Sequence, residues 1–281
     1  MRWLVTGSAG MLGQDLLEVI RAHGDEVTGV DRDDVDITDP MATAALAAGY
    51  DVVVNCAAYT AVDRAEEDEA PAFGVNAVGA ANVARSAHAA GARMVQISTD
   101  YVFDGGAHVP YPPDAPIDPR SAYGRTKAAG EWAVRAECPE HLIVRTAWLY
   151  GAHGPCFPKT IARAARERGT LDVVADQVGQ PTWTVDLAGL VVRLVVAGAP
   201  SGTYHGTASG QTSWHGFARA VVGAAGLDPE IVRPTTSADF VRPAARPAYS
   251  VLAHDSVLTA GVAPIGPWDE RWALAASTVL A

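Results

Sequence analysis

The chain has 281 residues, 49% of them hydrophobic, which is enough for one large domain or two modest ones with a buried core. Its formal net charge of −11 would repel nucleic acid and acidic membranes, which argues against both partners. No apolar run is long enough to cross a bilayer, no signal peptide is evident, and the three cysteines lack metal-ligand spacing. We therefore expect a cytoplasmic protein. We further expect a monomer or homodimer, and no required metal, because no convincing set of carboxylates has ligand spacing.

Short apolar runs alternate with helical patterns through residues 1–150. The runs that predict strands are 3–6, 26–30, 51–55, 93–98 and 142–146. The stretches that predict helices are 11–20, 41–48, 73–90 and 121–137. The strand-like runs are rich in β-branched residues and do not alternate with polar ones, which is typical of strands buried on both faces. This order predicts an α/β fold with a doubly wound parallel sheet of the Rossmann type.

The pattern changes after residue 151, where the predicted strands become short and proline becomes frequent. Helical patterns persist over 158–168, 185–197 and 214–225. We expect residues 1–150 to form a dinucleotide-binding domain and residues 151–281 a smaller substrate-binding subdomain. A helix and strand at about 185–205 are expected to return to the first domain.

A glycine-rich loop follows the first predicted strand. Gly7, Gly10 and Gly13 are spaced G-x-x-G-x-x-G and lead into an amphipathic helix. Glycine permits a tight turn there and lets the backbone approach a pyrophosphate, while the helix N-terminus directs N–H groups at the anion. A strand-to-helix turn needs glycine too, but the strand before and the helix after favour a dinucleotide site.

Charged residues at the end of the second predicted strand bear on the choice of dinucleotide. Asp31 lies where a carboxylate can bind the ribose 2′-hydroxyl of NADH, whereas the adjacent Arg32 suits the 2′-phosphate of NADPH. Both cofactors therefore remain open, and both residues can also be surface charges. Asp36 is a candidate for the adenine edge, with a capping role before Met41 as the alternative.

Tyr123 and Lys127 lie four residues apart in a predicted helix, so their side chains share one face. The chain has only two lysines, and the other is Lys159, so an ordinary exposed cation here would be expected to be arginine. A nearby ammonium favours a phenolate, so we expect the pKa of Tyr123 to fall towards working pH. Thr99, at the end of the fourth strand, can hydrogen-bond the same reacting oxygen.

These motifs resemble the extended short-chain dehydrogenase/reductase family, and within it the dTDP-4-dehydrorhamnose reductase branch. The matching segments are GSAGMLG (7–13), DVVVNCAAYTAVDRAE (51–66), VNAVGAANVA (75–84), STDYVFDG (98–105), SAYGRTKAAGE (121–131), RTAWLYG (145–151), DQVGQPTWTVDLA (176–188), GTYHGTASGQTSW (202–214) and RPAYSVL (246–252). The segments at 98–105, 145–151 and 176–188 are much more specific than the glycine loop. They follow in order along nearly the whole chain.

The resemblance implies reduction of the C4 ketone of dTDP-4-dehydro-6-deoxy-L-mannose by NADPH or NADH, which yields dTDP-L-rhamnose. In that reaction Tyr123 would protonate the developing alkoxide, and Lys127 would hold the nicotinamide ribose and lower the pKa of the phenol. Thr99 would hydrogen-bond the same oxygen, and Asn76 would support a proton relay through Lys127. The alternatives are a related 4-ketoreductase of an antibiotic pathway, or a non-catalytic regulatory subunit.

The resemblance also implies which residues bind the two ligands. Those expected at the cofactor are Gly7, Ala9, Gly10, Met11, Leu12, Gly13, Asp31, Arg32, Asp36, Ala57, Ala58, Tyr59, Asn76, Tyr123 and Lys127. Those expected at the substrate are Val62, Asp63, Thr99, Asp100, Tyr101, Trp148, Phe157, Gln177, Gln180 and Arg246. Arg246 is the candidate for the substrate diphosphate, and Trp148 for stacking on a nucleobase, with surface exposure and core packing as the respective alternatives.

Overall fold

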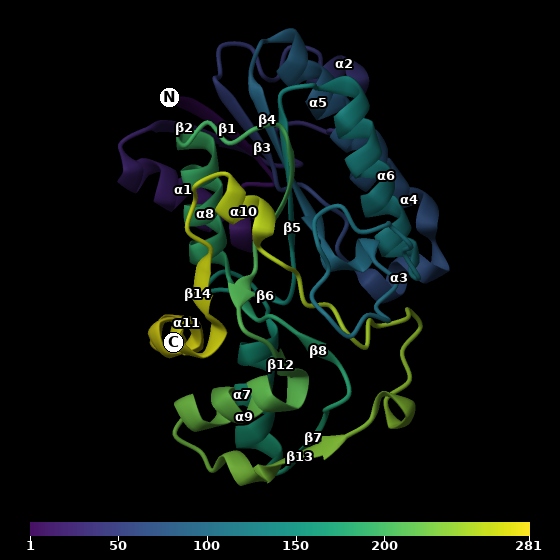
Figure 1. Cartoon of the computed structure of the whole chain (residues 1–281), viewed down its shortest axis with the longest axis vertical. Helices are drawn as coiled ribbons and strands as arrows, with labels where there is room; N and C mark the ends of the chain where they lie inside the picture. Colours follow the sequence, from purple (N-terminus) through teal and green to yellow (C-terminus); the bar gives the residue numbers. More distant parts are fainter.

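The computed structural model describes residues 1–281, and its centre is a six-stranded sheet in the order β10-β5-β4-β3-β1-β2 (Figure 1). The strands are β1 (Arg2–Thr6), β2 (Glu26–Val30), β3 (Val52–Asn55), β4 (Arg93–Thr99), β5 (His141–Thr146) and β10 (Gly202–His205). Every neighbouring pair is parallel, which confirms the predicted sheet. The strand order reverses between β1 and β3, and ligands of such sheets bind at this switch point, beyond the carboxyl ends.

Alternate strand residues enter two separate cores, one on each face of the sheet. The helices over the two faces are α1 (Met11–His23), α5 (Ala80–Ala89), α6 (Ala122–Glu137) and α8 (Thr184–Val196). Val5 and Val54 pack with α1 and α8, whereas Leu4 and Val53 pack with α5 and α6. Figure 1 shows these helices on opposite sides of the strands. Burial on both faces explains why the strands read as continuous apolar runs.

A second lobe lies below the sheet in Figure 1 and has its own apolar core around Tyr150, Phe217 and Trp272. Its helices are α7 (Phe157–Arg168), α9 (Trp214–Ala224) and α11 (Trp268–Leu280). Its two-stranded sheets pair β7 (Leu171–Val174) with β13 (Val232–Thr235), β8 (Val178–Gly179) with β12 (Thr212–Ser213), and β6 (Leu149–Tyr150) with β9 (Thr182–Trp183). A further pair, β11 (Ala208–Ser209) with β14 (Ile265–Pro267), and the short helix α10 (Asp255–Thr259) contribute to the core of the main sheet instead.

The chain crosses between the two lobes more than once. After β6 it builds α7 and β7, and it then returns through α8, which packs on α1, to β10, which pairs with β5. The six-stranded sheet and its helices thus contain segments from both halves of the sequence. No helix is both long and apolar enough to span a membrane.

Two predicted helices differ from the structure. The helix expected at 41–48 is only α2 (Pro40–Thr43), and the chain continues as turns in which the Ala44, Leu46 and Ala48 N–H groups bond three residues back. The helix expected at 73–90 begins earlier, as α4 (Glu69–Phe73), and passes through a π-helical segment, Gly74–Gly79, before α5. π-helical turns often occur at functional sites, and this one carries Asn76.

Candidate functional site

Two glycines of the loop between β1 and α1 are packed too closely for any other residue. Gly7 has a φ of +70°, and a Cβ there would lie 2.6 Å from the Ala57 nitrogen at the end of β3. A Cβ on Gly13 would lie 2.3 Å from the Gly7 carbonyl oxygen. The N-terminus of α1 has no side-chain cap and no acidic residue in its first turn. Its free N–H groups therefore suit an anion such as a pyrophosphate.

Asp31 supports this loop from β2. Its Oδ2 accepts the Ala9 N–H at 2.8 Å and its Oδ1 accepts the Arg32 N–H at 2.8 Å. The Arg32 side chain is exposed, and it directly follows Asp31, the residue that contacts the loop. Asp36 is exposed and accepts the Thr38 N–H and hydroxyl. The suggested cap before Met41 is supplied by Asp39 instead, so that alternative for Asp36 was wrong.

Other predicted cofactor residues line the neighbouring strand ends. Ala57, Ala58 and Tyr59 follow β3 and are half-buried. Met11 is half-buried, whereas the side chain of Leu12 lies in the apolar core between the sheet and helices α1 and α8. Leu12 can therefore present only its backbone to a ligand.

Thr99 is the last residue of β4, Asp100 follows it, and both are almost fully buried. The Thr99 hydroxyl donates to Asp100 Oδ1 at 2.9 Å, while Asp100 Oδ2 has no hydrogen-bond partner. Burial raises the pKa of the Asp100 carboxyl to about 6, against the opposing effect of hydrogen bonds from Thr99 and Ser250. A buried acceptor without a donor is costly unless a ligand completes it.

The Tyr123 ring meets the Tyr101 ring edge to face, with centroids 5.5 Å apart. Gly124 permits this contact, because a Cβ there would lie 2.2 Å from the Tyr101 carbonyl oxygen. Burial and the Asp100 carboxylate raise the pKa of the Tyr123 phenol, and the Thr99 hydroxyl acts in the opposite direction. The phenol therefore remains protonated at neutral pH and lies among the predicted substrate residues.

Lys127 does not act on Tyr123 as expected. Its Nζ donates to the Ile97 carbonyl oxygen at 2.7 Å, and it is not among the charges that shift the pKa of Tyr123. The prediction of a lowered phenol pKa was therefore wrong for this site, because burial and Asp100 outweigh any shared-face effect. Burial also lowers the pKa of Lys127 to about 8, while Glu131 and Cys56 act to raise it.

Asn76 lies in the π-helical segment and hydrogen-bonds both the loop after β3 and helix α6. Its side-chain oxygen accepts the Tyr59 N–H at 2.9 Å, and its amide nitrogen donates to the Tyr59 carbonyl and to the Thr126 hydroxyl. A Cβ on Gly130 would lie 2.1 Å from the Asn76 carbonyl oxygen. The side chain thus ties the β3 loop to α6, and the proton relay remains a prediction.

Two predicted substrate residues far apart in sequence form an ion pair. Arg246 Nη2 lies 2.9 Å from Asp63 Oδ1, in the first turn of α3 (Val62–Glu67). The half-buried Val62 begins that helix. Arg246 and Tyr101 also line one small pocket beside α6. The other residues of that pocket are Phe103, Asp104, Arg120, Ser121, Ala245 and Pro247. Anionic groups of a ligand at this pocket would meet two arginine side chains.

Trp148 is the only non-glycine residue with a positive φ, at 48°. Its ring stacks on Trp214 with centroids 3.6 Å apart, and the centroid of the Phe157 ring lies 4.5 Å from that of Trp214. Gly179 packs against the indole edge, where a Cβ would lie 2.5 Å from Trp148 Cε2. Strained backbone of this kind persists only where surrounding structure holds it, and it is frequent at ligand sites. Trp214 therefore covers one face of the Trp148 ring, so packing, the alternative considered for Trp148, accounts for that face.

The two predicted glutamines differ in placement. Gln177 is half-buried and donates to the Ser237 hydroxyl at 2.8 Å. Gln180 is 2% exposed, and its amide bonds both the Leu252 backbone and the Thr207 hydroxyl. These bonds hold Gln180 inside the protein, and its role in substrate binding remains a prediction.

The profile of the family described as "RmlD substrate binding domain" matches residues 1–280. The chain belongs to the RmlD family. A dTDP-4-dehydrorhamnose reductase of Streptomyces griseus is 47% identical to it over 95% of this chain and 90% of the relative. A dTDP-4-keto-6-deoxy-D-glucose reductase of Streptomyces niveus is also 47% identical, over 95% of this chain and 93% of the relative.

A solved structure shares the whole fold of this RmlD-family chain. It is a dTDP-4-dehydrorhamnose reductase of Bacillus anthracis in complex with NADP, which is 35% identical, covers 98% of each chain and has a TM-score of 0.93. The fold shared with this NADP-bound relative agrees with the glycine loop described above.

Some residues that shape this RmlD-family site carry only weak sequence signals. Gly124 and Gly130 lie inside a helix, where glycine costs up to about 1 kcal/mol relative to alanine, so each needs a packing reason. Trp214, which stacks on Trp148, begins α9 and gives no sign in sequence of its partner. These contacts join segments that are distant in the chain.

Proposed function

We propose that the protein is an NAD(P)H-dependent reductase of the C4 ketone of a dTDP-linked 4-keto-6-deoxy sugar, with dTDP-4-dehydro-6-deoxy-L-mannose as its substrate and dTDP-L-rhamnose as its product. The observation that carries this proposal is the grouping of a protonated phenol, a buried hydroxyl and an unsatisfied carboxylate at the carboxyl end of β4. The glycine loop lies at the switch point of the same sheet.

The residues present fit a nicotinamide dinucleotide. The uncapped N-terminus of α1 and the glycine backbone would hold its pyrophosphate, and Asp31 and Arg32 would hold its adenosine ribose. Lys127 would hold the ribose on the nicotinamide side. When bound, the dihydronicotinamide supplies the hydride that a ketone needs to become an alcohol.

Tyr123 would act as the proton donor. Its raised pKa keeps the hydroxyl protonated until negative charge develops on the substrate oxygen, when the proton transfers to that oxygen. The Thr99 hydroxyl, which now donates to Asp100, would orient the same oxygen. Asp100 Oδ2 would accept a sugar hydroxyl, which gives this buried acceptor its missing partner.

The substrate's nucleotide part would lie towards the second lobe. The Asp63–Arg246 pair lies beside the Tyr101 pocket, and Arg246 would bind the diphosphate. Val62, Trp148, Phe157 and Gln177 would surround the remainder of the substrate. We further propose that the enzyme acts in the cytoplasm as a monomer or homodimer.

An assay of cofactor oxidation tests the function. Purified protein should oxidise NADPH or NADH with dTDP-4-keto-6-deoxy-L-mannose, and the UDP analogue should be a much poorer substrate. The D-gluco-derived 4-keto sugar is the comparison that the Streptomyces niveus relative suggests, and faster turnover of it would favour the antibiotic-sugar alternative. Cofactor binding with no turnover of any sugar would instead support a regulatory subunit.

A matched pair of variants tests the proton donor. Tyr123→Phe should lower kcat by at least about 100-fold and leave cofactor affinity nearly unchanged, whereas Lys127→Ala should impair both. Tyr204→Phe is the control, because it removes a hydroxyl that donates to the Pro200 carbonyl at the other end of the sheet. An active Tyr123→Phe enzyme would rule out this assignment.

A further inference from the structure

The short helix α3 packs beside the start of α6, and two of its carboxylates reach parts of the site that are far apart in sequence (Figure 1). Asp63 and Glu66 are three residues apart, so their side chains share one face of the helix. Asp63 bonds the segment that carries Arg246. Glu66 bonds the first turn of α6, which carries Tyr123. Glu66 is not among the residues proposed to bind cofactor or substrate.

Glu66 fixes the beginning of α6. Its Oε1 accepts the Ala122 N–H at 2.7 Å, and Ala122 is the first residue of the helix, directly before Tyr123. The hydroxyl of Ser121 accepts the Gly124 N–H at 3.1 Å, so two side chains share the free donors of this helix end. A carboxylate at this place also interacts favourably with the helix dipole.

Packing between α3 and α6 makes the position of Tyr123 sensitive to that bond. Ala65 is fully buried in a cluster with Ala122, and the Tyr123 ring packs against the same cluster. A second tie joins Glu69 of α4 to Arg125, but these side chains are 41% and 47% exposed, so their ion pair contributes little. The bond to the Ala122 N–H is therefore the polar contact that sets where the first turn of α6, and with it the phenol, lies relative to α3.

Asp63 orients the arginine at the other end of the site. Its Oδ1 accepts the Ala244 N–H at 3.2 Å and a hydrogen bond of 2.9 Å from Arg246 Nη2. Arg246 Nη1 donates in turn to the Ala244 carbonyl at 3.3 Å. These bonds fix the guanidinium where it lines one pocket with Tyr101, whose ring meets that of Tyr123 edge to face. Tyr101 thus contacts both the arginine pocket and the phenol.

We propose that α3 sets the spacing between the proton donor and the residue that binds the substrate diphosphate. Glu66 is the positioning residue for Tyr123. Asp63 is the positioning residue for Arg246 and acts on the substrate through that arginine. The inference rests on the proposed function, because both groups have to act on one dTDP-linked sugar. In such a substrate the sugar ring joins the ketone to the diphosphate and limits the distance between them, and one short rigid helix that places both partners matches that distance.

Single variants of the whole protein separate the two roles in the cofactor-oxidation assay. Glu66→Ala should lower kcat by about 10-fold and leave the KM for the dTDP-sugar within about twofold, because a misplaced proton donor slows the chemical step. Asp63→Ala should raise that KM by about 10-fold and leave kcat within about twofold, because the arginine loses its orientation. Glu67→Ala is the matched control, since this side chain is exposed on the same helix, and it should behave as wild type does.

Glu66→Gln distinguishes a lost hydrogen bond from a general loss of stability. Its amide oxygen can still accept the Ala122 N–H, so it should recover most of the kcat that Glu66→Ala loses. Three results would overturn the proposal: wild-type kcat in Glu66→Ala, a glutamine variant as slow as the alanine variant, or the same joint change of kcat and KM in Glu66→Ala and Asp63→Ala.

Two measurements without turnover separate this proposal from the proposed function, which fails if wild type reduces no sugar. In calorimetry, Asp63→Ala should bind dTDP about 10-fold more weakly than wild type does, whereas the affinity for dTMP, which lacks the second phosphate, should change by less than about threefold. Hydrogen exchange of the backbone at residues 121–124 should be about 10-fold faster in Glu66→Ala and unchanged in Glu67→Ala. Unaltered dTDP affinity or unaltered exchange would overturn the proposal, whatever the enzyme reduces.

Discussion

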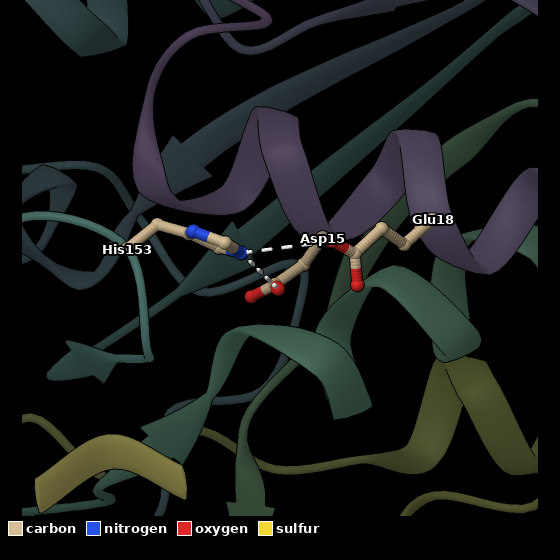
Figure 2. Close-up of side chains that lie close together, drawn as sticks. All are labelled: Asp15, Glu18 and His153. Atoms are coloured by element: carbon tan, nitrogen blue, oxygen red, sulfur yellow. Dashed lines mark ion pairs between the residues drawn. The ribbon is translucent and has the colours of Figure 1, made fainter. Parts of the chain in front are cut away.

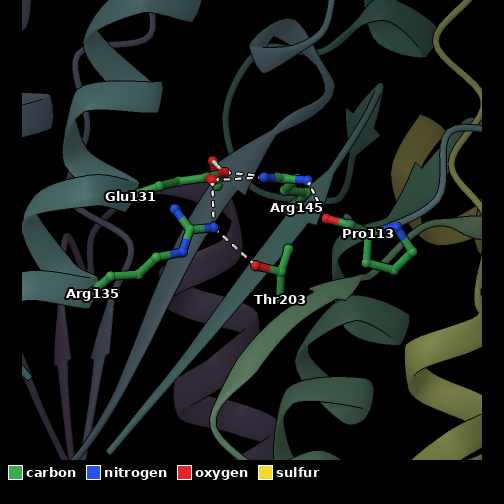
Figure 3. A network of polar contacts seen from close by, with 6 residues as sticks. Pro113, Glu131, Arg135, Arg145 and Thr203 are labelled. Carbon is green, nitrogen blue, oxygen red and sulfur yellow. Dashed lines mark hydrogen bonds and ion pairs between the residues drawn. The ribbon is translucent and has the colours of Figure 1, made fainter. Parts of the chain in front are cut away.

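Glu131 is the centre of a buried cluster of charges between α6 and the sheet, and its removal should destabilise the fold strongly. Its carboxylate accepts two hydrogen bonds of 2.8 Å from Arg145, one of 3.1 Å from Arg135 and one of 2.6 Å from Ser98 (Figure 3). Arg135 also reaches Thr203 on β10, as Figure 3 shows. The cluster therefore links α6 to three strands of the sheet.

The expected magnitude follows from burial. Glu131 is 0% exposed and Arg145 is 1% exposed, so Glu131→Gln leaves a buried guanidinium without its counter-charge. Loss of one partner of a buried pair costs about 3–5 kcal/mol, which is a large part of the 5–15 kcal/mol that stabilises a typical domain. Glu137→Gln, on the same helix, breaks a half-exposed pair with Arg85 and should cost about 1 kcal/mol or less.

Urea unfolding followed by circular dichroism measures both variants. The double variant Glu131→Gln/Arg145→Met should be less destabilised than the sum of its single variants, because neither charge is then left alone. Burial raises the pKa of Glu131, but hydrogen bonds from Arg145 and Ser98 outweigh it, so the net pKa is lowered. The carboxylate therefore stabilises the fold above about pH 4.5, and the gap between wild type and Glu131→Gln should narrow as pH falls below that value. Equal stabilities of Glu131→Gln and Glu137→Gln would refute the reasoning.

Asp100→Asn should raise the free energy of unfolding at pH 7.5 by roughly 1–3 kcal/mol, because burial raises the pKa of Asp100 to about 6 and makes its ionised form costly. The stability of wild type should approach that of Asp100→Asn as pH falls from about 6 to 4. Thermal melts at pH 7.5 measure the difference, and a less stable Asp100→Asn would contradict this prediction. The kcat/KM for cofactor should fall as pH rises through about 8, where the buried Lys127 loses its proton, and a profile that is flat to about pH 9.5 would count against this. Arg32→Ala should raise the KM for NADPH by about 10-fold and leave that for NADH within about twofold, since the exposed guanidinium is available to a 2′-phosphate; equal changes for both cofactors would exclude this role.

Most of the central fold could be predicted from local patterns. The five strand-like runs in residues 1–150 all form strands of the parallel sheet, because apolar runs without alternation have to be buried on both faces. The boundaries of α6, α7, α8 and α9 fall within one residue of those expected. The helix expected at 41–48 fails after Thr43, whose hydroxyl bonds back to the Asp39 and Pro40 carbonyls.

Electrostatic relations in the site could not be predicted in the same way. Helical spacing correctly places Tyr123 and Lys127 in one helix, but the pKa of each depends on burial and on groups from other elements. Asp100, one residue after β4, raises the pKa of Tyr123, and the β4 backbone takes the hydrogen bond of Lys127. A pattern within one helix contains neither relation.

The sequence alone determined the features that act over a few residues: the glycine loop, the strand and helix pattern, and the candidate phenol, ammonium and hydroxyl. Tertiary structure decided which distant groups meet, such as Asp63 with Arg246, Trp148 with Trp214, and Asp15 with His153 (Figure 2). The physical reason is that backbone sterics and apolar periodicity are local, whereas ion pairs, stacking and desolvation depend on the distances that the packed chain creates.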